Sequence, residues 1–208
     1  MTQLILIRHG QTLWNQQHRV QGHSDSPLAE VGMRQARLLA RRLAQMEFTT
    51  LYSSDSGRAH HTARNIAEVT GHDIVVDRRL RERHFGVFEG LTFAEIQVRY
   101  PEAYARFRSR DPAYAVPGGE SLLAFRERAL GCLHDIAARH AQELVVVVTH
   151  GLVLDLIYRA AQGIGLGERR MHDLVNAGIN RLRFEAGTWH IEVWGDGAHL
   201  EEGLLTPP

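Results

Sequence analysis

Cysteine is scarce in this 208-residue chain, in which Cys132 is the single example. One thiol excludes an internal disulfide framework and favours a reducing compartment. The neighbours Ala129, Leu130 and Leu133 give Cys132 the setting of a buried helix face. We therefore expect Cys132 to be a packed thiol rather than a reactive one.

Long apolar runs and an excess of charge are also lacking. No apolar stretch approaches the ~18 residues of a membrane span, and no basic segment precedes an apolar run of signal-peptide length. We therefore expect a soluble, cytoplasmic protein with no membrane contact. Lys+Arg and Asp+Glu both number 24, and aromatic residues make up 7%. The sequence thus has neither the basic stripe nor the stacking aromatics of a nucleic-acid binder, and we predict no nucleic-acid partner.

The spacings of a zinc site are missing too. Paired cysteines and a His-Glu-x-x-His segment are both absent. His60 and His61 are adjacent, so on a helix their side chains would point about 100° apart and could not bind one ion together. We predict neither a metal site nor a cofactor.

Strand-like and helix-like segments alternate along the chain, with no linker or low-complexity stretch between them. Short branched apolar runs predict strands, and amphipathic runs predict helices. The predicted strands are 4–7, 49–53, 74–76, 144–148, 180–185 and 189–194, the last two as a hairpin, and the predicted helices are 29–46, 57–69, 92–100, 121–140 and 152–161. This alternation indicates an α/β fold, a three-layer α/β/α sandwich with a mostly parallel central sheet. We expect a single domain, 1–208, with a loose tail over about 196–208.

A first strand that runs into Arg8, His9 and Gly10 indicates phosphoryl chemistry. A guanidinium offers a planar fork of donors to a phosphate, and the neighbouring imidazole can attack phosphorus. Arg58 follows the second strand, and His150 follows the valine-rich strand. Because the carboxyl ends of parallel strands share one edge of a sheet, we expect these residues to converge on one pocket.

Several stretches carry a resemblance to a known family. They are Arg8-His9-Gly10-x-Thr12-x-x-Asn15, Leu28-x-x-x-Gly32-x-x-Gln35-Ala36, Ser53-x-x-x-x-Arg58-Ala59-x-x-Thr62-Ala63, Leu80-Arg81-Glu82-Arg83-His84-Phe85-Gly86-Val87-Phe88-Glu89-Gly90, Pro117-Gly118-Gly119-Glu120-Ser121 and Val145-Val146-Val147-Val148-Thr149-His150-Gly151. In this order, from about residue 3 to about residue 160, they resemble the motifs of the histidine phosphatase superfamily, also called the phosphoglycerate mutase-like family. The resemblance implies the same α/β fold and a phosphoryl-transfer enzyme.

The resemblance also implies a role for each motif residue. His9 would attack the phosphoryl group and form a phosphohistidine that water later opens, with a backbone carbonyl fixing its tautomer. Glu82 would protonate the leaving oxygen and then deprotonate the water, with its pKa raised by burial. A loop ion pair of Glu82 with Arg81 or Arg83 is the alternative interpretation. Arg8, Arg58, Asn15 and a protonated His150 would stabilise the phosphate charge, and further substrate contacts would come from Gln21, Gly22 and Gly151.

The segment 91–116 bears on the substrate, because we expect it to form a small helical cap. Cofactor-dependent mutases of the family carry a longer insertion here, so its shortness favours the phosphatase branch. Specificity would be set by Tyr100, Tyr104, Arg106, Phe107 and Arg108, although the aromatic residues fit the core of the cap equally well. We predict hydrolysis of a small phosphorylated metabolite, and a homodimer is compatible with the sequence. A phosphoglycerate mutase is the alternative, and a non-catalytic module that binds phosphorylated ligands is a third interpretation.

Overall fold

One six-stranded sheet organises the fold. The computed structural model describes residues 1–201, and its strands lie in the order β3-β2-β4-β1-β5-β6. They are β1 (Thr2–Arg8), β2 (Thr50–Ser53), β3 (Ile74–Val76), β4 (Leu144–Thr149), β5 (Ile179–Glu185) and β6 (Thr188–Asp196). The strands β3, β2, β4 and β1 are parallel, whereas β5 and β6 are antiparallel to their neighbours. The predicted mostly parallel sheet and closing hairpin are confirmed.

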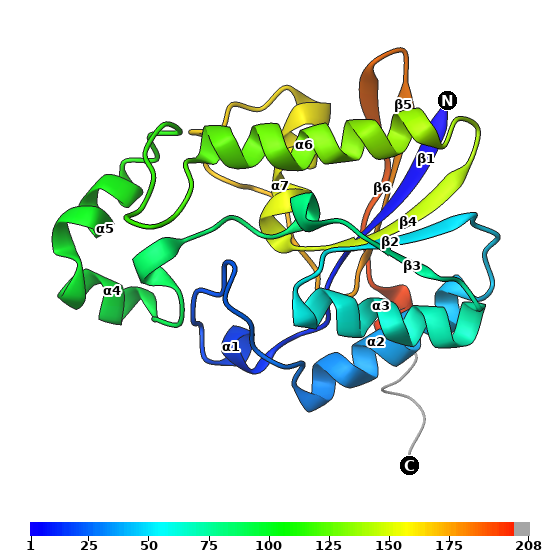
Figure 1. Cartoon of the computed structure of the whole chain (residues 1–208), viewed down its shortest axis with the longest axis horizontal. Helices are drawn as coiled ribbons and strands as arrows, with labels where there is room; N and C mark the ends of the chain where they lie inside the picture. Colours follow the sequence, from blue (N-terminus) through cyan, green and yellow to red (C-terminus); the bar gives the residue numbers. More distant parts are fainter. Residues whose placement is uncertain (202–208) are drawn as a thin grey trace.

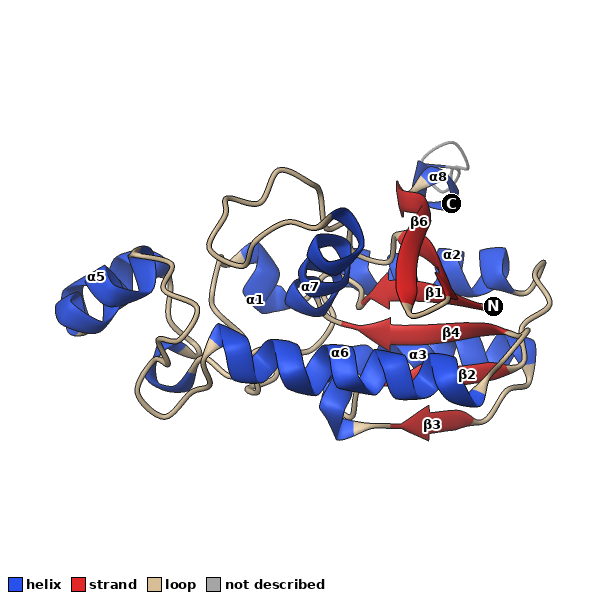
Figure 2. Cartoon of the chain, turned by 90° about the horizontal axis from the view of Figure 1, so that it is seen from above, coloured by secondary structure: helices blue, strands red, loops and turns tan. Residues whose placement is uncertain are grey.

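Helices cover both faces of the sheet, which gives the three predicted layers (Figures 1 and 2). The α-helices are α1 (Leu13–Gln16), α2 (Glu30–Leu43), α3 (Gly57–Thr70), α4 (Phe93–Arg99), α5 (Pro101–Arg108), α6 (Leu122–Arg139), α7 (Gly151–Gln162) and α8 (Ala198–Glu201), and two 3₁₀ turns are η1 (Arg78–Leu80) and η2 (Gly86–Phe88). Figure 1 places α6 and α7 on one face of the sheet and α2 and α3 on the other. Among residues 1–201, no helix has the length and apolar character to cross a membrane.

Alternation along the strands explains why both layers pack on the sheet. On β1, Leu4 and Leu6 pack with α6 and α7, whereas Ile5 and Ile7 pack with α2 and α3. All four side chains are fully buried, as expected for a parallel strand covered on both faces. Burial of each stabilises the fold by roughly 1.5–3 kcal/mol. The layers therefore fix the position of β1, whose carboxyl end carries Arg8.

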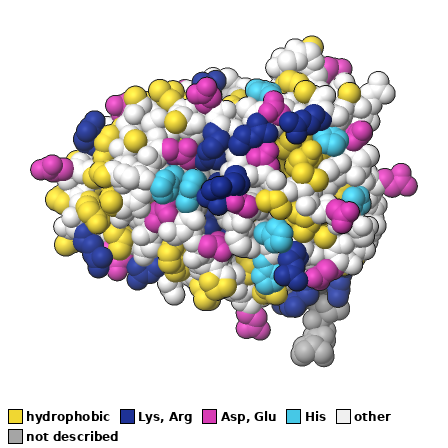
Figure 3. All heavy atoms as spheres, in the orientation of Figure 1, with side chains coloured by type: hydrophobic (Ala, Val, Ile, Leu, Met, Phe, Trp, Pro, Cys, Tyr) yellow, Lys and Arg dark blue, Asp and Glu magenta, His cyan; other side chains and the backbone are white. Residues whose placement is uncertain are grey.

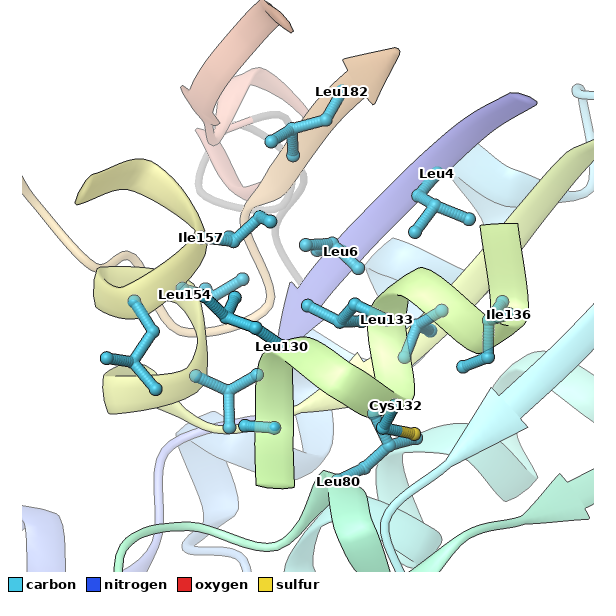
Figure 4. Packing of buried hydrophobic residues seen from close by; sticks show 14 of the residues in the cluster. Leu4, Leu6, Leu80, Leu130, Cys132, Leu133, Ile136, Leu154, Ile157 and Leu182 are labelled. Atoms are coloured by element: carbon cyan, nitrogen blue, oxygen red, sulfur yellow. The ribbon is translucent and has the colours of Figure 1, made fainter. Parts of the chain in front are cut away.

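Cys132 lies in the core between α6 and the sheet, close to Leu80 and Leu133 (Figure 4). Its side chain is fully buried. Burial, with the nearby carboxylate of Asp77 as a second cause, raises the pKa of Cys132 to about 12. A raised pKa makes a thiolate scarce at neutral pH. The burial confirms the prediction of a packed thiol.

The segment 91–116 carries α4 and α5, which project beyond one end of the sheet (Figures 1 and 2). They share a small core made of Phe88, Ile96, Tyr114 and Val116. The predicted helix over 92–100 corresponds to α4, but α5 was missed. Pro101 occupies the first turn of α5, where a missing N–H costs nothing, and α5 has no fully buried residue that would give a clear apolar stripe.

The carboxyl-terminal segment differs from the loose tail expected over about 196–208. Residues 198–201 form α8, and His199 is buried with its Nε2 3.0 Å from the carbonyl oxygen of Ala177. Leu200 packs against the core on the α2 side of the sheet. The expectation is therefore wrong for residues 196–201, because this apolar contact and hydrogen bond hold the segment in place. Residues 202–208 lie outside the described part of the chain.

Candidate active site

The carboxyl ends of β1, β4 and β2 lie side by side, and the predicted catalytic residues follow them. Arg8 is paired with Thr149 in the β1–β4 register, so His9 and His150 are neighbours. Their ring centroids lie 5.3 Å apart. Arg58, in the first turn of α3, extends to the same place and contacts His9. The structure thus brings Arg8, His9, Arg58 and His150 together at one edge of the sheet, as the sequence predicts.

His9 is held as a neutral imidazole whose Nε2 lone pair accepts a hydrogen bond from Arg58. Its Nδ1 lies 2.8 Å from the carbonyl oxygen of Gly10, which can only accept, so Nδ1 carries the proton. Nε2 accepts a 3.2 Å hydrogen bond from Nε of Arg58. Burial, followed by the positive charges of Arg58 and Arg8, lowers the pKa of His9 well below 6.5. A neutral ring of this tautomer is a competent nucleophile.

Arg58 is fully buried and is held by the loop that precedes α2. Its Nη2 donates to the carbonyl oxygen of Gly22 (2.8 Å), and Nη1 donates to the carbonyl oxygen of Ser24 (2.9 Å) and to Asp25 Oδ1 (2.9 Å). Burial lowers the pKa of Arg58, while the charges of Glu82 and Asp25 oppose this change. These contacts fix the plane of the guanidinium before any ligand arrives.

The guanidinium of Arg8 has a hydrogen-bond donor without a partner among the described residues. Its Nη1 donates to the carbonyl oxygen of Leu174 at 2.6 Å. Its Nε is buried and, within residues 1–201, has no hydrogen-bond partner. A buried donor without a partner is costly, and a bound anion would satisfy it. Burial lowers the pKa of Arg8, and the carboxylate of Glu82 opposes this change.

His150 lies beside His9 and is fully buried. Its Nε2 is 2.8 Å from the hydroxyl oxygen of Ser54, and its Nδ1 is buried with no partner within residues 1–201. Burial, followed by the charge of Arg58, lowers the pKa of His150 well below 6.5. Two guanidiniums and the loss of water thus disfavour a further positive charge in the ligand-free site. The expected protonation of His150 concerns the phosphate-bound site and stays a prediction.

Glu82 faces the same cavity with both carboxylate oxygens held by backbone N–H groups. Arg83 N donates to Oε1 (2.9 Å) and Leu152 N donates to Oε2 (3.1 Å). Burial raises the pKa of Glu82, although these hydrogen bonds and the nearby arginines oppose the rise. The alternative ion pairs are not formed, because Arg81 pairs with Asp55 and Arg83 donates to backbone carbonyls.

The predicted substrate contacts have different surroundings. Asn15 caps α1 through Oδ1 and lines the cavity. Gln21 and Gly22 also line it, although the Gln21 side chain accepts from Thr12 and the Gly22 carbonyl holds Arg58. Gly151 begins α7 beside Arg8, and a Cβ there would lie 3.4 Å from Nε of Arg8. That is an ordinary van der Waals distance, so the geometry assigns Gly151 no further role and its predicted substrate contact stays a prediction.

The cavity has a volume of about 560 Å³. Its outer wall includes residues for which no role was predicted, namely His18, Arg19, Phe85, Phe93, Arg170 and Asn176. Of these, Asn176 donates to the carbonyl oxygen of His9 at 2.7 Å. The five cap residues expected to set specificity do not line this cavity. Tyr100, Tyr104 and Phe107 pack within the cap, and Arg106 stacks on Tyr114. Arg108 lines a separate cavity of about 260 Å³.

Charge on the surface is mixed. Figure 3 shows basic and acidic side chains interspersed over the face drawn, in keeping with a formal net charge of zero. Positive charge gathers inside the cavity instead, where Arg8, Arg19, Arg58 and Arg170 line the wall with Glu82 as the acidic residue. Within residues 1–201, no group of three or more His, Cys, Asp or Glu side chains is placed to hold a metal ion. The arrangement favours a small anion.

Comparison with known proteins gives a consistent result. The sequence profile of the "Histidine phosphatase superfamily (branch 1)" matches residues 4–197. The chain is 40% identical to "Metal-independent phosphoserine phosphatase" from Arabidopsis thaliana, with 96% of this chain and 84% of that protein covered. It is 39% identical to "Phosphoglycerate mutase-like protein 4" from the same organism, with 96% and 87% covered. The structure of "Bacillus stearothermophilus YhfR" is similar with a TM-score of 0.87 and 37% identity, covering 96% of this chain and all of that one (100%). The chain therefore belongs to the histidine phosphatase superfamily.

Proposed function

We propose that this protein is a metal-independent phosphatase that hydrolyses small phosphomonoesters through a phosphohistidine intermediate. The observation that carries the proposal is the state of His9, a neutral ring whose Nε2 lone pair lies beside the guanidiniums of Arg8 and Arg58. A phosphate bound there meets a nucleophile and preorganised positive charge together. The relative named as a metal-independent phosphoserine phosphatase supports the same activity.

In the proposed first step, Nε2 of His9 forms a bond to phosphorus as the bond to the leaving oxygen breaks. The Nε–H of Arg58, which donates to His9 in the free site, turns to a phosphate oxygen, and Nε of Arg8 binds another. Glu82 gives its proton to the departing alkoxide. In the second step Glu82 takes a proton from water, the water oxygen attacks phosphorus, the N–P bond breaks, and inorganic phosphate leaves.

The outer wall of the cavity bears on the leaving group. Phe85 and Phe93 offer apolar surface, while Arg170 adds a positive charge. This wall suits a small organic group with an acidic substituent, and phosphoserine belongs in the first substrate panel because of the relative's name. The name of the mutase-like relative makes isomerisation of a phosphoglycerate the second candidate. We further propose that the enzyme acts in the cytoplasm, alone or as a homodimer, since a single buried thiol suits a reducing compartment.

The decisive experiment is a phosphate-release screen over phosphomonoesters in EDTA, with and without 2,3-bisphosphoglycerate. We expect release that neither EDTA nor the bisphosphate changes. Activity that EDTA abolishes and zinc or magnesium restores would contradict metal independence. Isomerisation that depends on the bisphosphate, without release, would establish a mutase instead.

The intermediate can be trapped separately. Enzyme quenched after brief contact with ³²P-labelled substrate should carry a phosphate that is labile in acid and stable in base. His9→Ala should carry none. Undiminished turnover by His9→Ala would remove this residue from the role of nucleophile.

A further inference from the structure

The carboxylate of Glu89 joins two loops that meet at the cavity. Its Oε1 accepts hydrogen bonds from the backbone N–H groups of His23 (2.9 Å) and Phe85 (2.9 Å). Its Oε2 accepts from the backbone N–H and the hydroxyl of Ser24, both at 2.7 Å. The Glu89 side chain is 8% exposed. Both oxygens are engaged by these donors and Glu89 is not among the residues that line the cavity, so Glu89 acts on structure around the site rather than on substrate.

One of the two loops holds Arg58. The peptide group between residues 22 and 23 donates its N–H to Glu89 and accepts from Nη2 of Arg58 (2.8 Å) at its carbonyl oxygen. Because a peptide group is planar and rigid, fixing the N–H also fixes the direction of the carbonyl. Ser24, also bound to Glu89, offers its carbonyl to Nη1 at 2.9 Å. Arg58 is therefore oriented by a loop that Glu89 orients.

The other loop carries the general acid. Phe85, whose N–H is bound to Glu89, lies three residues after Glu82 and lines the cavity. The same carboxylate thus links the wall that holds Arg58 with the wall that holds Glu82. A change at residue 89 would shift the two walls relative to one another.

The backbone at Gly22 is shaped to this contact. Its φ of +57° lies in the left-handed region that favours glycine, and a Cβ there would lie 2.0 Å from Oε1 of Glu89. The loop can approach the carboxylate only because residue 22 has no side chain. This observation is independent of the hydrogen bonds and points to the same close contact.

We infer that Glu89 is a positioning residue for phosphoryl transfer, which sets the distance and orientation of Arg58 relative to Glu82. The inference rests on the proposed function. Burial alone would raise the pKa of Glu89, but the hydrogen bonds from Ser24, His23 and Phe85 outweigh it and the pKa is lowered. The carboxylate is ionised at neutral pH and accepts from all four donors. A glutamine would keep one acceptor oxygen and turn an NH₂ group toward N–H donors.

The test compares Glu89→Gln with Glu120→Gln. Glu120 is the matched control, because its carboxylate also accepts a backbone N–H, from His84, and also lies in a hydrogen-bonded setting, with Arg128. The hydrogen bonds and ion pair of its carboxylate go to His84 and Arg128, and not to the loop that holds Arg58. Three quantities are measured for each protein: kcat on p-nitrophenyl phosphate, the Kd of inorganic phosphate by calorimetry, and the urea midpoint of unfolding.

We expect Glu89→Gln to lower kcat on the order of 10- to 100-fold and to weaken phosphate binding severalfold, since small misplacement of reacting groups is that costly. Glu120→Gln should lose comparable stability and keep the Kd of phosphate within about twofold. Its kcat is not compared, because Glu120 holds the N–H of His84, two residues after Glu82. Ser24→Ala, which removes the side-chain bond to Glu89 and keeps the carbonyl bound to Arg58, should change the same quantities less, and it decides the matter if Glu89→Gln does not fold.

The inference would be overturned if Glu89→Gln lost stability without a change in kcat or in phosphate affinity. If Glu89→Gln does not fold, the same result in a folded Ser24→Ala would overturn it. Equal losses of phosphate affinity in Glu89→Gln and Glu120→Gln would overturn it as well. Failure of the proposed function is distinguishable, because a wild-type protein without phosphatase activity still reports the Kd of phosphate. In that case weaker phosphate binding in Glu89→Gln alone would still establish that Glu89 positions Arg58.

Discussion

The buried neutral histidines make stability depend on pH. Folding places His9 and His150 beside Arg8 and Arg58, and burial lowers both pKa values well below 6.5. An unfolded histidine titrates near 6.5, so below that pH the unfolded chain binds protons that the folded chain does not, and stability falls. Between pH 7.5 and 5.5 each histidine should lower the free energy of unfolding by about 1.4 kcal/mol, and the pair by about 2.7 kcal/mol. That is a large share of the roughly 5–15 kcal/mol by which a domain is stable.

Urea unfolding, followed by tryptophan fluorescence at several pH values, measures this loss. Other histidines titrate in the same range, so the His150→Asn variant isolates one contribution: it should lose about 1.4 kcal/mol less than wild type over this interval. The exposed His61→Asn serves as the control for replacing a histidine. Saturating phosphate should flatten the wild-type dependence, because a bound dianion stabilises a protonated His150. Equal pH dependence in wild type and His150→Asn would refute the reasoning.

Three further predictions concern single side chains. Glu82→Gln should be slowed strongly on an alkyl phosphate and much less on p-nitrophenyl phosphate, whose phenolate leaves without a proton; equal losses in the pre-steady-state phosphorylation phase would remove Glu82 from the role of acid. Ser54→Ala removes the hydroxyl 2.8 Å from His150 and should cost about 1–3 kcal/mol in urea unfolding, with lower kcat; unchanged values would contradict the contact. Arg170→Ala, at the exposed rim of the cavity, should raise KM for phosphomonoesters with a second acidic group while kcat on p-nitrophenyl phosphate stays the same; equal KM values would place the second group elsewhere.

The elements that carry the site could be predicted because their signals are local. Four apolar residues precede Arg8, and four consecutive valines precede Thr149 and His150, so the strands and their carboxyl ends could be identified without the structure. The parallel register then places Arg8 opposite Thr149. Convergence at one sheet edge follows from topology, which alternation of strands and helices already indicates.

The supports of the site could not be predicted, because each is a polar residue in a loop whose partner is remote in the chain. Asn176 bonds the backbone of His9 across 167 positions, and Ser54 meets His150 across 96. Neither shows a period or a motif. The neutral state of His150 in the ligand-free site could not be predicted for a similar reason: its pKa depends on complete burial next to Arg58, and burial cannot be read from the sequence.

The ionisation of the empty site suggests how two adjacent histidines can take different roles in the proposed mechanism. Both are neutral before substrate arrives, since Arg8 and Arg58 already supply the positive charge. A phosphate dianion would draw the Nε–H of Arg58 away from His9 and leave its lone pair free to attack. His150 has no such role in bond formation, so the field of the dianion can raise its pKa until it takes up a proton and donates to the phosphate. Substrate binding would then carry about one proton into the site. The two rings differ because, of the pair, His9 alone donates its Nδ1 proton to a backbone carbonyl, that of Gly10, which leaves Nε2 of His9 to meet the incoming phosphorus.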